Sequence, residues 1–163
     1  MNILSIRSDY SLPRPGDQVA LCEPGTCGYK EDYPVWLEGH LDVTSGRRWT
    51  KSMNNPTWVR REGPNTPPVA MADRFTAWLY CNLVRGPVVL AGLTLDCCVL
   101  ATAMELNHRG YDVKILLPAT DTYCGSLDAK TAVSQVVSNW ATCIGFDDFI
   151  GLCYRMSHIH KTE

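Results

Sequence analysis

The sequence predicts a three-layer αβα fold, in which a mostly parallel, Rossmann-like sheet lies between helices. Apolar runs of strand length alternate along the chain with segments whose apolar residues recur every three or four positions. One run, residues 87–93 (PVVLAGL), is apolar throughout, which is typical of a central parallel strand covered on both faces. The 163 residues show no internal repeat, and we expect one domain over residues 1–163 with a flexible tail from residue 155.

The first half of the chain is predicted to hold two short strands separated by loops. Residues 2–10 (NILSIRSDY) form a strand that ends at Asp9, and residues 47–51 (RRWTK) form a second strand, rich in bulky and β-branched residues. Segments rich in Pro and Gly lie between them. Residues 54–70 hold four prolines and are predicted to be a loop that could close over a site as a flap.

Helices and strands alternate regularly in the second half. Apolar residues at steps of three and four predict a helix from Val69, which Gly86 and Pro87 end. Residues 97–110 (CCVLATAMELNHRG) are then predicted to form a helix closed by Gly110.

The last three predicted elements follow the same alternation. Residues 111–119 (YDVKILLPA) read as a strand, and residues 126–141 as a helix with Ser126 as its N-cap. A final short strand is predicted within residues 146–154 (FDDFIGLCY).

Composition and charge exclude several classes of protein. The formal net charge is −2 and no run of Lys or Arg exceeds a pair, which argues against binding to nucleic acid or an anionic membrane. No apolar run is long enough to span a bilayer, and we expect no signal peptide at Met1. We therefore expect a cytoplasmic protein that acts on a small molecule, with no nucleic-acid or membrane partner.

Eight cysteines are more than a chain of this length usually has. A disulfide scaffold fits poorly, because such scaffolds are short and core-poor, whereas this chain has several long apolar segments. A zinc site is not indicated either, since no two cysteines have the CxxC spacing. Outside the doublet at positions 97 and 98, we expect the cysteines to be small buried hydrophobes in a reducing compartment.

Cys97 and Cys98 stand together where the apolar strand meets the following helix. In open α/β sheets, ligands bind beyond the carboxyl ends of the strands. A cysteine in the first turn of a helix faces unpaired backbone N–H groups and the positive end of the helix dipole, which favour the reactive thiolate. The same N–H groups can stabilise the oxyanion that forms when a carbonyl is attacked. The alternative is that both cysteines only pack a tight turn.

Residues 92–103 (GLTLDCCVLATA), followed by GYDV at 110–113, resemble the signature of the isochorismatase-like cysteine hydrolases, roughly G-[VI]-x-T-[DE]-x-C-V-x-x-T-A, a helix and G-Y-x-V. The register of this resemblance selects Cys98, not Cys97, as the nucleophile. Residues 24–28 (PGTCG) also resemble the family's P-G-T-x-G stretch.

The resemblance implies hydrolysis of a small amide, ureido or related carbonyl compound through a thioester on Cys98. Lys51 matches the family's catalytic lysine, which holds the thiolate by charge or carries a proton; the alternative is a surface lysine beside a loop. The family also implies a non-proline cis peptide at Leu93–Thr94 and an oxyanion hole made by the backbone amides of Thr94 and Cys98. It favours a homo-oligomer, either a dimer or a tetramer.

No metal or other cofactor is expected. Nicotinamidase-type relatives bind zinc or a similar ion through an aspartate and two closely spaced histidines, but after Asp9 this sequence has no histidine before His40. The branch of the family that cleaves isochorismate usually lacks the cysteine, so Cys98 weighs against that activity.

One departure from the family concerns its third catalytic residue, an aspartate usually written D-x-Q, because this sequence has no D-x-Q. Only about 20 residues precede Cys22, too few for the family's strand, helix and second strand. Either residues 2–10 are that second strand and the usual N-terminal strand and helix are missing, or the elements are compressed and Asp9 replaces the aspartate. The competing function is a catalytically impaired homologue that keeps the fold for oligomerisation or for binding a ligand or partner.

Other residues near the expected site have no assigned role. Asp121 and Cys124 lie beyond the predicted strand residues 112–117, so we expect them on the same rim as the cysteine doublet. Trp36, Trp49 and Trp58 flank the Lys51 region and either line a pocket or pack as ordinary core residues.

Overall fold

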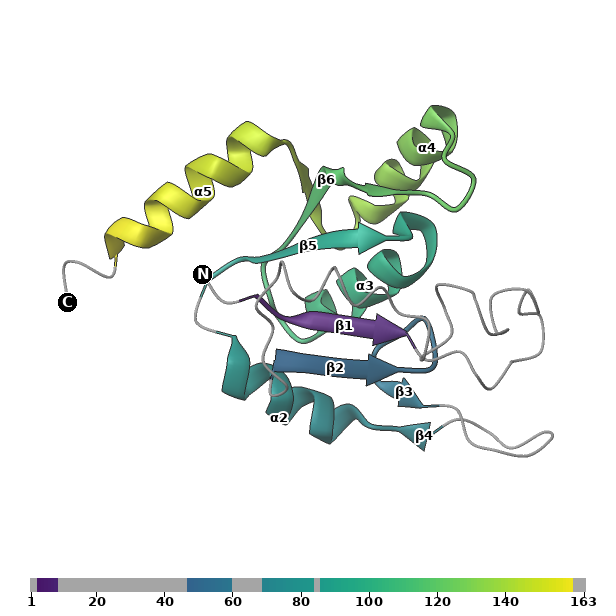
Figure 1. Ribbon diagram of the computed structural model, residues 1–163, viewed down its shortest axis with the longest axis vertical. Coiled ribbons are helices and arrows are strands. Elements are labelled where there is room, and N and C mark those ends of the chain that lie inside the picture. The colour runs from purple at the N-terminus through teal and green to yellow at the C-terminus, as the bar shows by residue number, and fades with distance from the viewer. Residues whose placement is uncertain (1–2, 9–46, 60–68, 84–85, 160–163) are drawn as a thin grey trace. The chain divides into compact units, whose positions relative to one another are not determined.

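The computed structural model describes residues 3–8, 47–59, 69–83 and 86–159 (Figure 1). They belong to two compact units, residues 2–84 and residues 85–163. Predictions made for Asp9, Trp36 and the PGTCG stretch lie outside the described residues. Both units combine helices with parallel strand pairs, which confirms the predicted α/β class.

In the unit of residues 2–84, two short strands form a parallel ladder. β1 is Ser5–Ser8 and β2 is Arg48–Lys51, and Ser8 is opposite Lys51 in the register. Both predicted strands are therefore confirmed, the second beginning one residue later than expected. Because the strands are parallel, their carboxyl ends lie at the same edge of the ladder.

The predicted loop at 54–70 contains regular structure at both of its ends. β3 (Trp58–Val59) pairs antiparallel with β4 (Val69–Ala70), so the chain forms a short hairpin here. Before β3, the side-chain oxygen of Asn55 accepts hydrogen bonds from the N–H and the hydroxyl of Thr57, at 2.8 and 2.6 Å. This arrangement is an Asx turn, in which a side chain, and not a neighbouring strand, accepts the backbone hydrogen bond. The turn immediately precedes β3.

Helix α2 (Ala72–Asn82) follows the hairpin and packs its apolar face inward. Phe75 and Leu79 are buried, as expected for residues four apart on one helix face. The ring of Trp49 in β2 lies 5.1 Å from the ring of Phe75 and 5.6 Å from that of Trp78, measured between centroids. Trp49 is half-buried and thus packs β2 against α2 within this unit. The helix ends at Asn82, before the predicted stop at Gly86.

The unit of residues 85–163 is built on a three-stranded parallel sheet in the order β5-β6-β7. Its strands are β5 (Val88–Leu93), β6 (Val113–Asp121) and β7 (Thr142–Ile144). The predicted strands at 87–93 and 111–119 are confirmed, but β6 rather than β5 is the central strand of this sheet. The burial pattern agrees, since β6 holds the buried Val113, Ile115 and Leu116, whereas β5 is only half-buried or exposed.

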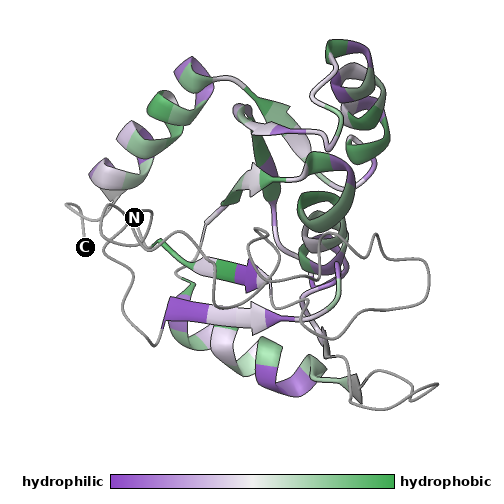
Figure 2. Ribbon diagram, turned by 45° about the vertical axis from the view of Figure 1, so that its right-hand side comes forward, coloured by the Kyte–Doolittle hydropathy of each residue, from purple (hydrophilic) through white to green (hydrophobic). Residues whose placement is uncertain are grey.

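Helices flank this sheet on two sides. α3 (Leu100–His108) and α5 (Phe146–Ile159) contact β6, and α4 (Leu127–Val137) contacts β7. Figure 1 shows α4 and α5 on opposite sides of β6, and Figure 2 shows that α3 is predominantly hydrophobic. The sheet is therefore a layer between helices, as predicted.

The ends of α3 and α4 match the predicted capping residues. Gly110 has a φ of +84°, and its N–H donates to the Asn107 carbonyl at 2.8 Å while the next N–H, of Tyr111, reaches Leu106 at 3.1 Å. This pair of bonds is a Schellman motif, which a glycine at this position favours. At the start of α4, the Ser126 hydroxyl accepts a hydrogen bond from the Ala129 N–H at 3.3 Å, which confirms the N-cap.

The predicted strand at 146–154 is wrong, because these residues lie in helix α5. An apolar run of this length cannot be assigned to a strand or a helix by periodicity alone. The deciding signal is the acidic first turn, where Asp148 accepts a hydrogen bond from the N–H of Gly145 at 3.3 Å. Residues 155–159, expected to belong to a tail, form the last turn of the same helix.

Candidate active site

Cys98 lies in a π-helical turn, Leu95–Val99, directly after β5. The N–H of Val99 donates to the Thr94 carbonyl at 3.1 Å, five residues earlier, and the Cys97 N–H donates to the same oxygen at 3.2 Å. Residues 94–99 are called the cysteine turn below. Leu95 and Val99 are buried and fix its ends, while both cysteines are half-buried. Single π turns of this kind are frequent at functional sites.

The backbone at the start of the cysteine turn has two special features. The Leu93–Thr94 peptide bond is cis, as the family resemblance implied. Gly92, just before it, has a φ of +125°, a conformation that residues with a side chain rarely adopt. On the other side, the Thr102 hydroxyl donates to the Cys98 carbonyl at 2.7 Å and is buried. The glycine and the threonine of the motif therefore shape the backbone around Cys98.

The Asp96 carboxylate connects the cysteine turn to the loop that follows β6. Both of its oxygens lie within hydrogen-bonding distance of the Tyr123 N–H, at 3.2 and 3.3 Å. The two segments start side by side, because Leu93 at the end of β5 is opposite Asp121 at the end of β6. This register confirms that Asp121 and its successors share the rim of the sheet with the cysteine doublet.

Residues 122–125 form a tight turn on this rim. The Thr122 N–H donates to the Asp121 carboxylate at 2.8 Å, and the Gly125 N–H donates to the Thr122 carbonyl at 3.1 Å. The Cys124 sulfur lies 3.7 Å from the Thr122 hydroxyl. The side chains of Tyr123 and Cys124 are exposed, so this turn presents an aromatic ring and a thiol to solvent.

Lys51 is the last residue of β2, and only 2% of it is exposed. Its ammonium group donates to the Ser8 hydroxyl at 3.2 Å and to the Met53 carbonyl at 3.0 Å. A buried ammonium is costly unless hydrogen bonds replace its hydration. The alternative interpretation of Lys51 as a surface lysine is therefore wrong.

The predicted catalytic residues are distributed over both units. Cys98 belongs to the unit of residues 85–163 and Lys51 to the unit of residues 2–84. Asp9 lies outside the described residues, although it directly follows β1 in the sequence. The grouping of Cys98, Lys51 and Asp9 in one site thus stays a prediction.

The six cysteines that the structure describes are all free thiols. Cys143 and Cys153 are half-buried, but Cys81 and Cys124 are exposed, which corrects the expectation that the cysteines outside the doublet are buried. Burial raises the pKa of the Cys143 thiol above its ordinary value, because desolvation disfavours the thiolate. Cys143 is therefore a poor nucleophile at neutral pH.

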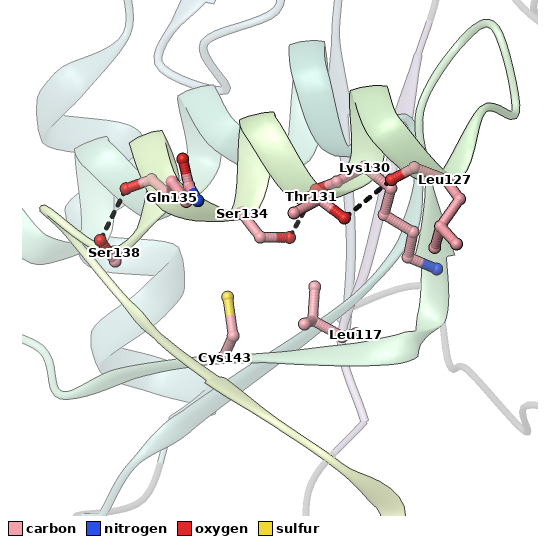
Figure 3. Close-up of a pocket in the computed structure, with 8 residues that line it drawn as sticks. All are labelled: Leu117, Leu127, Lys130, Thr131, Ser134, Gln135, Ser138 and Cys143. Carbon is pink, nitrogen blue, oxygen red and sulfur yellow. Dashed lines mark hydrogen bonds between the residues drawn. The ribbon is translucent and has the colours of Figure 1, made fainter.

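A groove of about 470 Å³ lies between α4 and the strands β6 and β7 (Figure 3). The Cys143 sulfur points toward α4 across this space. No pattern in the sequence indicated the groove, and no residue of the cysteine turn lines it. Its lining residues are Leu117, Leu127, Lys130, Thr131, Ser134, Gln135, Ser138 and Cys143.

The four described ranges contain neither a metal-binding cluster nor a membrane-spanning helix. No group of three or more His, Cys, Asp or Glu side chains comes together there in a way that could hold a metal ion. Of the helices in the same ranges, none combines the length and the apolar character needed to cross a membrane.

Comparison with known proteins identifies the fold. No protein-family profile and no curated protein sequence matches the chain. Among solved structures, an isochorismatase-like hydrolase from Alkaliphilus metalliredigens is similar with a TM-score of 0.53 and 18% identity, over 90% of this chain and 70% of that one. A nicotinamidase/pyrazinamidase from Bacillus subtilis is similar with a TM-score of 0.50 and 18% identity, over 86% of this chain and 71% of that one. Together with the helices and parallel sheets described above, these likenesses show that the chain has the three-layer α/β fold of the isochorismatase-like hydrolases.

Proposed function

We propose that the chain is a cysteine-dependent member of the isochorismatase-like hydrolases and that it cleaves a small amide, ureido or related carbonyl compound. The observation that carries the proposal is the buried, hydrogen-bonded ammonium of Lys51 at the carboxyl end of a parallel strand. A lysine in such a place has to be held against a large desolvation cost, which favours a chemical role over a structural one. The fold and the motif around Cys98 support hydrolysis at this cysteine as the reaction type.

In the proposed reaction, the Cys98 thiolate attacks the carbonyl carbon of the substrate and a C–S bond forms. The carbonyl electrons move to oxygen, and the backbone amides of Thr94 and Cys98 stabilise the resulting oxyanion. Collapse of this intermediate breaks the C–N bond, the leaving nitrogen takes up a proton, and a thioester remains. Water then attacks the thioester carbonyl and loses a proton, the C–S bond breaks, and the acid leaves with the thiolate restored.

The other residues of the proposed site handle charge and protons. Lys51 holds the thiolate by its positive charge or carries a proton between the two half-reactions. Asp9 is the candidate for the acid–base carboxylate that the family places after its first strand. The proposed enzyme is cytoplasmic, forms a dimer or tetramer of identical chains, and needs neither a metal nor another cofactor. The free thiols of the described cysteines fit a reducing compartment.

The test of this proposal is release of ammonia from a panel of small primary amides and ureido compounds. We expect release by the wild type and by Cys97→Ser, the adjacent-cysteine control, and none by Cys98→Ser. Acid quenching during turnover should trap an acyl adduct whose mass maps to Cys98. Release that persists in Cys98→Ser would contradict a thioester on this residue.

Asp9 is tested separately, with Asp9→Asn assayed on whichever amide the wild type hydrolyses. If Asp9 transfers the proton, turnover should fall by about 10²-fold or more, since acid–base groups contribute at that level. Turnover equal to the wild type would mean that Asp9 does not replace the family's aspartate.

A further inference from the structure

The hydrogen bond between Asp96 and the Tyr123 N–H joins two segments that are 27 positions apart in the sequence. Asp96 lies inside the cysteine turn, two residues before Cys98, and Tyr123 lies in the turn after β6. From this contact we propose that Asp96 is a positioning residue, which fixes the cysteine turn so that Cys98 is held at the start of the helix, where a thiolate is favoured. This role rests on the proposed function, in which Cys98 is the nucleophile.

The cysteine turn is held from within by the Thr94 carbonyl, which accepts from the Cys97 and Val99 N–H groups, and from α3 by the Thr102 hydroxyl, which donates to the Cys98 carbonyl. Asp96 adds a link to the loop after β6. Leu95 and Val99 are buried at its two ends, but the residues between them are only half-buried. Asp96 is one of these residues, and its two oxygens share one N–H donor at 3.2 and 3.3 Å. A carboxylate that accepts from a backbone N–H makes a charge-assisted bond, which is stronger than a bond between neutral groups. This bond therefore restrains the turn next to Cys98.

The charge of Asp96 and its positioning role have opposite effects on Cys98. A carboxylate two residues away disfavours the thiolate by repulsion between like charges. An ordered turn favours the thiolate, because it holds Cys98 at the start of a helix, where the helix dipole stabilises an anion. Removing the side chain therefore raises Cys98 reactivity if only the charge matters and lowers it if positioning matters.

Two pairs of variants separate these effects. Asp96→Ala removes both the charge and the acceptor, whereas Asp96→Asn removes the charge but keeps an amide oxygen that can accept from the same N–H. Tyr123→Pro removes the donor and leaves Asp96 intact, and Tyr123→Ala removes the ring but keeps the N–H. Proline suits this position, since residue 123 follows Thr122, whose carbonyl accepts from Gly125 in the manner of a β-turn.

The experiment measures alkylation of Cys98 by iodoacetamide, as the ratio of its rate at about pH 6.5 to its rate at about pH 9, where most thiols are ionised. We expect this ratio to fall at least fivefold in Asp96→Ala and Tyr123→Pro, and to stay within twofold of the wild type in Asp96→Asn and Tyr123→Ala. Asp112→Ala is the charge control, because Asp112 is exposed and pairs with Lys114 at 2.8 Å. It should leave the ratio unchanged.

Hydrogen exchange of the Tyr123 amide provides a readout that does not depend on Cys98. Exchange should accelerate at least tenfold in Asp96→Ala and stay slow in Asp96→Asn, while the amides of Ile115 and Leu116 in β6 report that the fold is intact. If Asp96→Ala does not fold, the Tyr123 pair gives the same comparison.

The possible results separate a failure of the positioning role of Asp96 from a failure of the proposed function. A higher ratio in both Asp96 variants, or a ratio unchanged in Asp96→Ala and Tyr123→Pro, overturns the positioning role while a reactive Cys98 still supports the proposed function. A wild-type Cys98 that reacts no faster than Cys97 at about pH 6.5, where ordinary thiols are mostly protonated, instead overturns the proposed function and this inference with it.

Discussion

Ser8 and Lys51 are opposite each other at the carboxyl ends of β1 and β2, and the lysine ammonium donates to the serine hydroxyl at 3.2 Å. The contact depends on the parallel pairing of two strands that are more than 40 positions apart in the sequence. It keeps a buried cation at the edge of the ladder, which is where ligands bind in folds of this class.

Ser8→Ala should destabilise the protein, because it removes one of the hydrogen-bond acceptors of a buried ammonium. We expect a loss of about 1.5–3 kcal/mol in the free energy of unfolding, the range for hydrogen bonds to charged groups. Urea unfolding followed by circular dichroism measures it. Ser5→Ala, on the same strand, is the control, and an equal effect of the two changes would argue against the Lys51 contact.

Phe75→Ala should create a cavity beside Trp49, because Phe75 is fully buried and its ring touches both Trp49 and Trp78. We expect a loss of about 3–5 kcal/mol in the free energy of unfolding. The control is Tyr80→Ala on the same helix, since Tyr80 is 85% exposed and its loss should stay within about 0.5 kcal/mol. A small effect at Phe75 would mean that this aromatic cluster does not form.

Ser126→Ala should weaken the start of α4 by removing the hydroxyl that accepts from Ala129. N-cap losses of this kind cost about 1 kcal/mol. Ser138→Ala at the other end of the helix is the comparison, because its hydroxyl donates only to the Gln135 carbonyl on an exposed surface. Chemical unfolding of the two variants should rank Ser126→Ala as the less stable one.

Cys143 should be alkylated more slowly than Cys124 near neutral pH. Burial raises the pKa of Cys143, so at any pH below that value a smaller fraction of it is thiolate, and only the thiolate reacts. Raising the pH should therefore accelerate Cys143 relative to the exposed Cys124, and unfolding in denaturant should abolish the difference. Peptide mass spectrometry with iodoacetamide measures both rates, and equal rates in the folded protein would contradict the raised pKa.

Local signals in the sequence were enough to predict several elements. The steps between Phe75, Trp78 and Leu79 predicted α2, and Gly110 marked the end of α3, because a left-handed residue is needed there. The same kind of signal failed at residues 146–154, where an apolar run fits a strand as well as a helix. The Asp148 contact that favours the helix became visible only in the structure.

The candidate active site also combines features that the sequence predicted with features that it could not predict. The motif located Cys98 at the end of a strand, and the cis peptide that it implied at Leu93–Thr94 is present. The burial of Lys51 and the Asp96–Tyr123 bond could not be predicted, since each depends on which strands pair and in which register. Residues 87–93 were expected to be a central strand, whereas β5 ends the β5-β6-β7 order of its sheet, because an apolar run alone does not reveal a strand's neighbours.

The central claim is that Cys98 is a thiol activated by Lys51. Its most direct test is the rate of iodoacetamide alkylation at Cys98 and Cys97, measured at about pH 6.5, below the ordinary range of thiol ionisation, in the wild type, in Lys51→Met and in the control Lys114→Met. We predict that wild-type Cys98 reacts at least tenfold faster than Cys97, that Lys51→Met removes most of this advantage, and that Lys114→Met keeps it. Equal rates at the two cysteines in the wild type would contradict the claim and favour a homologue that keeps the fold without the catalysis.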